Sequence, residues 1–176
     1  MGNRYIMTAF GKDRVGIVAD VTRLLYENEC NLEDTSMSML ADEFTLSLLF
    51  SSQQADIEAQ LAKECRRLEM EKEISAFVRP LQTAQQKSNK GYKTCTLHIE
   101  GLDQAGIVYK TSQFLADNQL NIISLISTTK ASPESGAPIY CMDIHIQVPE
   151  EVSLDQVEDK LGSVADELHV DVVMSR

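Results

Sequence analysis

A short loop motif that suits the binding of a small anion occurs twice in this sequence. The segment GKDRVGIV at 11–18 returns 90 positions later as GLDQAGIV at 101–108. Each copy has an aspartate three residues before a glycine, and an apolar stretch follows. We therefore expect each loop to lie where a strand leads into a helix, with Asp13 as the N-cap residue of the first helix. The N–H groups of a first helical turn lie at the positive end of the helix dipole and can receive a carboxylate.

Two interpretations remain open for the repeated glycines, Gly16 and Gly106, which we place in the first helical turn. Glycine weakens a helix, but it lets another backbone or a ligand approach closely. The first interpretation is close packing against a neighbouring strand. The second is contact with a bound carboxylate.

An asparagine follows each helix at the same offset, Asn31 in the first copy and Asn121 in the second. Each opens the next predicted strand, with Leu32 or Ile122 after it. A carboxamide both donates and accepts hydrogen bonds, which suits a zwitterionic amino acid. The alternative is a structural role, because asparagine tolerates the left-handed conformation found at helix C-termini.

Other chemistries find little support in the residue patterns. The repeated loop lacks the G-x-G-x-x-G pattern of dinucleotide-binding folds and the G-K-[ST] of P-loops. All three histidines, His98, His145 and His169, lie in the second copy, so no nucleophile has a repeated histidine partner. Strand alternation would place His98, His145 and Cys141 on one sheet face as candidate metal ligands, but the first copy has no equivalent set. We expect no metal, no cofactor and no enzymatic activity.

The charge of the chain disfavours one class of partner. The 176 residues include 27 acidic and 16 basic side chains, for a formal net charge of −11. Such a chain repels a nucleic-acid backbone, so we expect no direct contact with DNA or RNA. The acidic residues indicate either a solvated surface or a docking face for a basic partner.

Cysteine usage and hydropathy indicate the compartment. The four cysteines are dispersed without a C-x-x-C pair, which is typical of reduced thiols in the cytosol. They are Cys30, Cys65, Cys95 and Cys141. We find no secretion leader and no apolar stretch long enough to cross a bilayer, so we expect a cytoplasmic protein without membrane contact.

The apolar patterns predict the same order of elements twice, because alternation indicates strands and a spacing of three or four indicates helices. In the first copy the order β-α-β-β-α-β covers a strand at 4–10, a helix from 17, strands at 32–40 and 43–50, a helix at 57–68 and a strand at 74–79. The second copy covers a strand at 92–101, a helix from 107, strands at 121–130 and 138–148, a helix at 154–168 and a strand at 170–174.

Two domains follow from this repeat, at 1–79 and 92–176, joined by a linker at 80–91 that is rich in Gln, Lys, Ser and Asn. Right-handed crossovers place both helices of each domain on one face of an antiparallel four-stranded sheet. The predicted fold class is therefore α+β, with two tandem ferredoxin-like domains. Domains of this size bury a limited fraction of their surface, so we expect association into a homodimer.

With this element order, a D-x-x-G-I-V turn and an Asn followed by an aliphatic residue at the second strand, each half resembles an ACT domain. ACT domains are regulatory modules that usually bind amino acids at interfaces between domains, through the first strand-helix loop and the start of the second strand. The resemblance implies the following ligand-binding residues: Asp13, Arg14, Val15, Gly16, Ile17, Asn31, Leu32, Asp103, Gln104, Ala105, Gly106, Ile107, Asn121 and Ile122. The family often has proline before the glycine, where this chain has Val15 and Ala105.

A chain made only of two ACT domains is similar to the glycine cleavage transcriptional repressor group. That resemblance implies a non-catalytic regulator that binds glycine or a similarly small amino acid and contacts a transcription factor. The alternative is a regulatory subunit that binds a metabolic enzyme and mediates feedback control by an amino acid. Both functions are inferred by analogy of fold.

Overall fold

The computed structural model describes residues 3–81, 91–133 and 135–175, and it divides the chain into two compact units, Met1–Gln85 and Gln86–Arg176. We call them the first and the second unit. Most of the predicted linker, residues 82–90, lies outside the described residues. Pro80, predicted to begin the linker, is instead the last residue of a strand and pairs with Tyr5.

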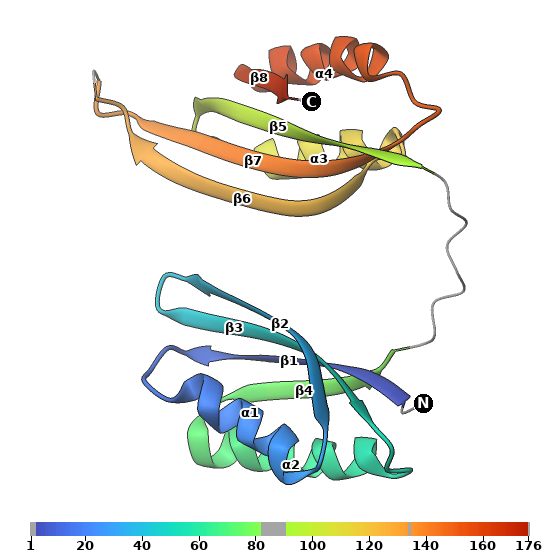
Figure 1. Cartoon of the computed structure of the whole chain (residues 1–176). Helices are drawn as coiled ribbons and strands as arrows, with labels where there is room; N and C mark the ends of the chain where they lie inside the picture. Colours follow the sequence, from blue (N-terminus) through green and yellow to red (C-terminus); the bar gives the residue numbers. More distant parts are fainter. Residues whose placement is uncertain (1–2, 82–90, 134, 176) are drawn as a thin grey trace. The chain divides into compact units, whose positions relative to one another are not determined.

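The first unit has the predicted βαββαβ order (Figure 1). Its elements are β1 (Asn3–Lys12), α1 (Ile17–Glu27), β2 (Asn31–Leu40), β3 (Glu43–Ser52), α2 (Ile57–Lys72) and β4 (Ser75–Pro80). The strands form one sheet in the order β2-β3-β1-β4, and every neighbouring pair is antiparallel. The two central strands, β1 and β3, therefore carry the core, and β2 and β4 are edges.

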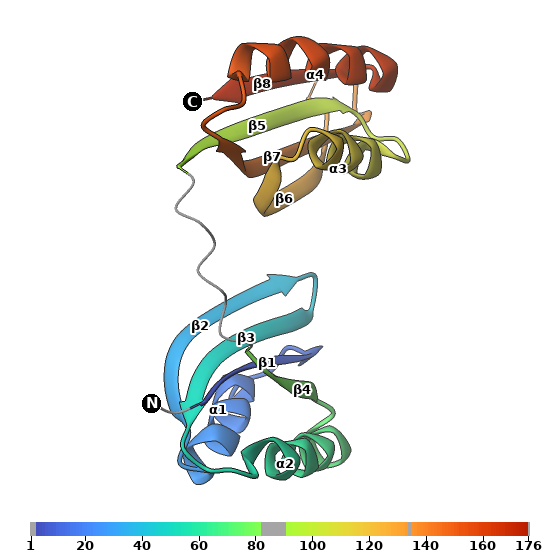
Figure 2. The ribbon, with the colours of Figure 1, turned by 90° about the vertical axis from the view of Figure 1, so that its right-hand side faces the viewer.

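The second unit repeats this arrangement. Its elements are β5 (Tyr92–Leu102), α3 (Ile107–Asp117), β6 (Asn121–Ala131), β7 (Pro138–Pro149), α4 (Leu154–Leu168) and β8 (Val170–Ser175). The sheet order is β6-β7-β5-β8, again antiparallel throughout. In each unit the two helices cover one face of the sheet (Figure 2). The predicted fold class is confirmed.

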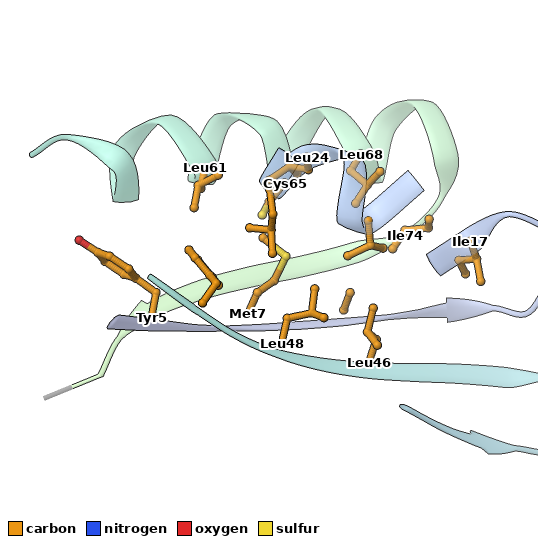
Figure 3. Packing of buried hydrophobic residues seen from close by; sticks show 14 of the residues in the cluster. Tyr5, Met7, Ile17, Leu24, Leu46, Leu48, Leu61, Cys65, Leu68 and Ile74 are labelled. Atoms are coloured by element: carbon orange, nitrogen blue, oxygen red, sulfur yellow. The ribbon is translucent and has the colours of Figure 1, made fainter. Parts of the chain in front are cut away.

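Alternation along the central strands builds the core of the first unit. Tyr5 and Met7 point from β1 toward the helices, where they meet Leu46 and Leu48 of β3 (Figure 3). Ala9, two residues further along β1, is buried in the same cluster. The helices contribute residues spaced by three or four, and these are buried: Ile17, Val21, Leu24 and Leu25 on α1, and Ile57, Leu61, Cys65 and Leu68 on α2. A fully buried leucine such as Leu61 contributes about 2–5 kcal/mol, judged by truncation to alanine.

No helix in the described part of the chain is long and apolar enough to cross a membrane.

Candidate functional site

The repeated loops start their helices differently from the prediction. Gly16, and not Asp13, is the N-cap residue of α1, and it has a left-handed backbone with φ of 89°. Gly106 takes the same position before α3, with φ of 101°. Asp13 uses its backbone N–H to bond the carbonyl of Asp42 at 2.8 Å, and no side chain caps the helix. The predicted N-cap role of Asp13 and the placement of both glycines inside the first turn are therefore wrong.

The conformation explains why both positions hold glycine. A Cβ atom added at Gly16 or Gly106 would meet nothing within 4 Å, which contradicts close packing against a neighbouring strand. A positive φ is costly for residues with a Cβ atom, so the turn itself requires glycine. The turn leaves the N-terminus of α1 open to solvent, and the preceding Val15 is fully exposed.

The two loops are anchored by different side chains. In the first unit the Arg14 guanidinium bonds the carboxylate of Asp20, with 2.6 Å between Nη2 and Oδ2. This hydrogen bond lowers the pKa of Asp20 below its ordinary value, and the positive charge of Lys72 acts in the same direction. In the second unit the Gln104 amide donates instead to the carbonyl of Leu168 at the end of α4. The repeated loops thus have distinct chemistry at equivalent positions.

Asn31 and Asn121 open β2 and β6, as predicted. Neither is a helix C-cap residue, because Asn28 and Asn118 hold those positions. Each cap amide bonds a carbonyl four residues earlier, at 2.7 Å from Asn28 Nδ2 to Leu24 and at 2.8 Å in the second unit. The structural alternative for Asn31 and Asn121 is therefore wrong. The sequence analysis did not identify Asn28 and Asn118 as cap residues, although they are 90 positions apart, as the two loops are.

A polar cavity of about 260 Å³ lies at the start of β2. It is lined by Glu29, Asn31, Ser51, Ser52, Gln53 and Gln54. Asn31 lies there because β2 pairs it with Ser51 of β3. Among the residues that the structure describes, no hydrogen bond to the Asn31 carboxamide is formed. Sequence analysis predicted Asn31 but missed the other lining residues, which only the strand register brings beside it.

The two halves of the predicted site do not meet within a unit. The loop at 13–17 precedes α1, and Asn31 follows it. Since α1 has 11 residues and a helix rises about 1.5 Å per residue, the two places lie about 16 Å apart along the helix. The same holds for the loop at 103–107 and Asn121 around α3. A small amino acid cannot touch both ends of one helix.

Beside α1 the first unit has an apolar groove and a free strand edge. The groove, of about 450 Å³, is lined by Ala19, Thr22, Arg23, Leu25, Tyr26, Cys30 and Leu32. β2 borders the sheet, and all ten of its residues are exposed, including Met37 and Met39. A long exposed edge strand presents unpaired backbone groups to any other strand.

The candidate metal ligands His98, Cys141 and His145 lie on the face of the second sheet that the helices leave open, as strand alternation predicted. His98 Nδ1 is 2.6 Å from Asp143 Oδ1, and His98 Nε2 is 3.8 Å from Glu100 Oε2. The hydrogen bond to Asp143 raises the pKa of His98. The Nδ1 atom of His145 is hydrogen-bonded to the Thr96 hydroxyl, with 2.9 Å between Nδ1 and Oγ1. Within the described ranges no three His, Cys, Asp or Glu side chains are arranged to hold a metal ion.

Comparison with known proteins finds one family and several relatives to which the chain is similar. Residues 3–79 match the ACT domain family. The chain is 25% identical over 170 residues to the glycine cleavage system transcriptional repressor of Escherichia coli, and the match covers 93% of this chain and 85% of that protein. A UPF0237 protein of Lactococcus lactis is 35% identical over 64 residues, which cover 36% of this chain and 74% of that protein.

A crystal structure of a protein from Galdieria sulphuraria has a TM-score of 0.81 and 25% identity, covering 99% of this chain and 98% of that one. The similarity therefore extends over both units.

Proposed function

The chain belongs to the ACT domain family, and from that premise we propose that it is a non-catalytic regulatory protein that binds a small amino acid and thereby changes its affinity for a transcription factor. The observation that carries the proposal is the similarity to the Escherichia coli repressor, which covers 93% of this chain. The negative charge of −11 favours contact with a protein over direct contact with DNA.

We propose that the effector contacts both the repeated loops, at 13–17 and 103–107, and the strand starts at Asn31-Leu32 and Asn121-Ile122. The open N-terminus of α1 supplies N–H groups for a carboxylate. The Asn31 carboxamide can both donate and accept, as an amino acid requires. The two contacts complement each other, but one first unit cannot supply both of them because α1 separates them.

A second copy of the chain can supply the missing half. If two β2 edges pair in antiparallel fashion about the middle of the strand, Asn31 of one copy lies beside Leu40 of the other. Asp13 bonds the Asp42 carbonyl, so the loop of the second copy lies at that same end. The exposed Met37 and Met39 and the groove beside α1 would be covered in such a pair. We therefore propose a homodimer in which each site is completed by the other copy.

This arrangement links binding to regulation. A ligand regulates only if it binds one arrangement more tightly than another. An amino acid held between two copies favours the paired arrangement, and a partner that recognises one arrangement then responds to the effector. Neither step requires a covalent reaction.

Two experiments test the proposal. Thermal-shift and calorimetric screens of the twenty amino acids should identify a small one that binds, and the absence of any ligand would remove the sensor role. Affinity purification from the native host should recover a transcription factor in an amino-acid-dependent manner. Recovery of a metabolic enzyme instead would favour a regulatory subunit.

Pairing through β2 is tested by Met37→Lys, because a charge on an edge strand opposes strand addition. Analytical ultracentrifugation should show the unaltered chain as a dimer and the variant as a monomer. Leu81→Lys, at another exposed apolar position of the first unit, is the matched control and should stay dimeric. A dimeric Met37→Lys variant would contradict pairing along this edge.

A further inference from the structure

We propose that the polar cavity at the start of β2 is the amino-acid pocket, that Glu29 receives the ammonium group of the ligand there, and that Gln147 closes the corresponding place in the second unit. The inference rests on the proposed function and narrows it, because of the two similar sites it retains the one that contains Asn31 and excludes the one that contains Asn121. It also names a residue, Glu29, that neither the repeated loop nor the strand start includes.

The size and the lining of the cavity fit a small zwitterion. Its volume of about 260 Å³ lies just below the range of roughly 300–1,000 Å³ found for drug-sized ligands. The Glu29 carboxylate supplies the one charge of the lining and attracts an ammonium group. The Asn31 carboxamide and the Ser51 hydroxyl both donate, so together with the loop of the second copy they can bond a carboxylate. An α-amino acid presents this pair of charges on adjacent carbons.

The backbone around the cavity is held by buried neighbours. The Gln54 amide donates to the carbonyl of Asn28 at 3.3 Å, and the Gln54 backbone N–H bonds the hydroxyl of Ser52 at 3.2 Å. Asn28 and Ser52 are the polar residues that the first unit buries most deeply, at 6% and 4% exposure. These bonds fix the far wall of the cavity, and Asn31 and Ser51 remain available.

Glu29 is fixed in an unusual conformation. Its φ is 54°, in the left-handed region, where a residue with a Cβ atom is uncommon. The turn between α1 and β2 imposes this angle, and Gln119 has the same conformation, with φ of 58°, after α3. The geometry of the turn is thus shared by the two units. Of these two equivalent positions, Glu29 carries a negative charge and Gln119 does not.

The second unit differs at the opposite wall as well. The sheet register places Gln147 beside Asn121, where the first unit has Ser51 beside Asn31. The Asn121 amide donates to Gln147 Oε1 at 3.2 Å. One donor of the Asn121 carboxamide is therefore used within the protein, and the longer glutamine side chain stands at the position that the serine holds in the first unit. The second unit thus lacks the charge of Glu29, and its asparagine amide is already engaged by a neighbouring side chain.

Isotope-labelled full-length protein titrated with glycine, L-alanine and L-serine tests the assignment by NMR. We expect amide shifts at Glu29, Asn31 and Ser51 and none at Gln119, Asn121 and Gln147. Shifts in the second unit, alone or to the same extent, would overturn the assignment and leave the regulatory function standing. No shift with any of the three would overturn both this inference and the small-amino-acid effector.

N-acetylglycine tests the role of the ligand's ammonium group without any change to the protein. It keeps the carboxylate and lacks the positive charge, so we expect at least about tenfold weaker binding than for glycine. Glu29→Gln should lose a similar factor for glycine and leave N-acetylglycine unchanged. Glu71→Gln removes the same charge from the far end of α2 and should change neither affinity. Equal affinities for the two ligands would overturn the role of Glu29.

Exchanging Ser51 and Gln147, the equivalent wall residues of the two units, tests whether Gln147 closes the binding place in the second unit. Ser51→Gln should weaken glycine binding at least about tenfold, because the added side chain occupies the amide of Asn31. Gln147→Ser combined with Gln119→Glu, which supplies the missing charge, should raise the stoichiometry measured by calorimetry from one to two glycines per chain, and Gln119→Glu alone should leave it at one. A stoichiometry of two in the unaltered protein or in Gln119→Glu, or of one in the double variant, would overturn the closure by Gln147. Melting curves of each variant report whether it is folded.

Discussion

Arg14 donates a hydrogen bond to Asp20 across the first turn of α1, with 2.6 Å between Nη2 and Oδ2. The pair ties the variable position of the loop to the helix that the loop precedes. In the second unit the same two positions hold Gln104 and Lys110, and Lys110 bonds Glu167 of α4 at 2.6 Å. The charge on the helix is therefore reversed between units. The loops share a backbone but differ in the electrostatic field at the helix N-terminus.

We expect Asp20→Asn to lower the free energy of unfolding by about 1 kcal/mol near neutral pH, the upper end of the range for a solvent-accessible ion pair. Because Arg14 lowers the pKa of Asp20 from 3.8, the stabilisation is fully present above that value. It is lost as the pH falls through the lower pKa of the folded state. Urea unfolding at about pH 7 and about pH 3 should show the difference between variants shrinking in acid.

Glu27→Gln is the control for that experiment, since it removes a negative charge from an exposed position of the same helix. It should change stability by less than about 0.5 kcal/mol. An Asp20→Asn deficit that persisted unchanged in acid would contradict the assigned ion pair.

Alanine at either left-handed glycine should destabilise the protein. Gly16→Ala and Gly106→Ala each force a Cβ atom into a positive φ, at a cost of about 1–2 kcal/mol. Neither creates a steric clash, because the added Cβ has no neighbour within 4 Å. Urea denaturation followed by circular dichroism measures the loss.

Gly162→Ala is the matched control for the glycine variants. Gly162 lies inside α4, and its added Cβ also has no neighbour within 4 Å. Alanine is favoured over glycine in a helix, so this variant should be stabilised by about 0.5–1 kcal/mol. A loss of stability in all three variants would show that space, and not backbone conformation, determines these positions.

The fold was predictable because burial follows strand alternation and helical spacing in this chain. Buried residues alternate with more exposed ones along each central strand, and Met7 of β1 and Leu48 of β3 are two of the fully buried ones. The helix start was not predictable in the same way, because Asp13 matches an N-cap pattern while the left-handed turn at Gly16 leaves no periodic trace. A preference for aspartate at N-caps was outweighed by the backbone geometry of the turn.

The cavity was harder to predict than the fold. Asn31 and Ser51 are 20 positions apart, and only the pairing of β2 with β3, including a bulge between Leu32 and Asp34, brings them together. A shift of register by one residue would place another side chain beside Asn31. The repeat itself did contain one overlooked clue. Glu29 and Gln119 occupy equivalent positions and differ in charge.

Asn28→Ala should be among the more damaging polar substitutions in the first unit. Its side chain is 6% exposed, and it bonds the Leu24 carbonyl at 2.7 Å. Removing a buried hydrogen-bond partner costs about 1–3 kcal/mol. Asn118→Ala makes the equivalent change where the asparagine is only half-buried, so urea unfolding should show a smaller loss there. Equal losses would mean that burial of the cap does not decide the cost.

Histidine titration by NMR should show His98 with a pKa above 6.5, because the hydrogen bond to Asp143 stabilises the imidazolium and Glu100 adds to the effect. A raised pKa in the folded state means that this stabilisation is fully present below 6.5 and is lost as the pH rises through the folded pKa. Asp143→Asn removes the carboxylate at 2.6 Å and should bring the His98 pKa back toward 6.5. Asp171→Asn is the control, because Asp171 pairs with Glu100 on the same face and does not bond His98. If Asp171→Asn lowered the His98 pKa as much as Asp143→Asn, the shift would come from the general negative field of this face. A selective effect of Asp143→Asn would instead establish the direct pair.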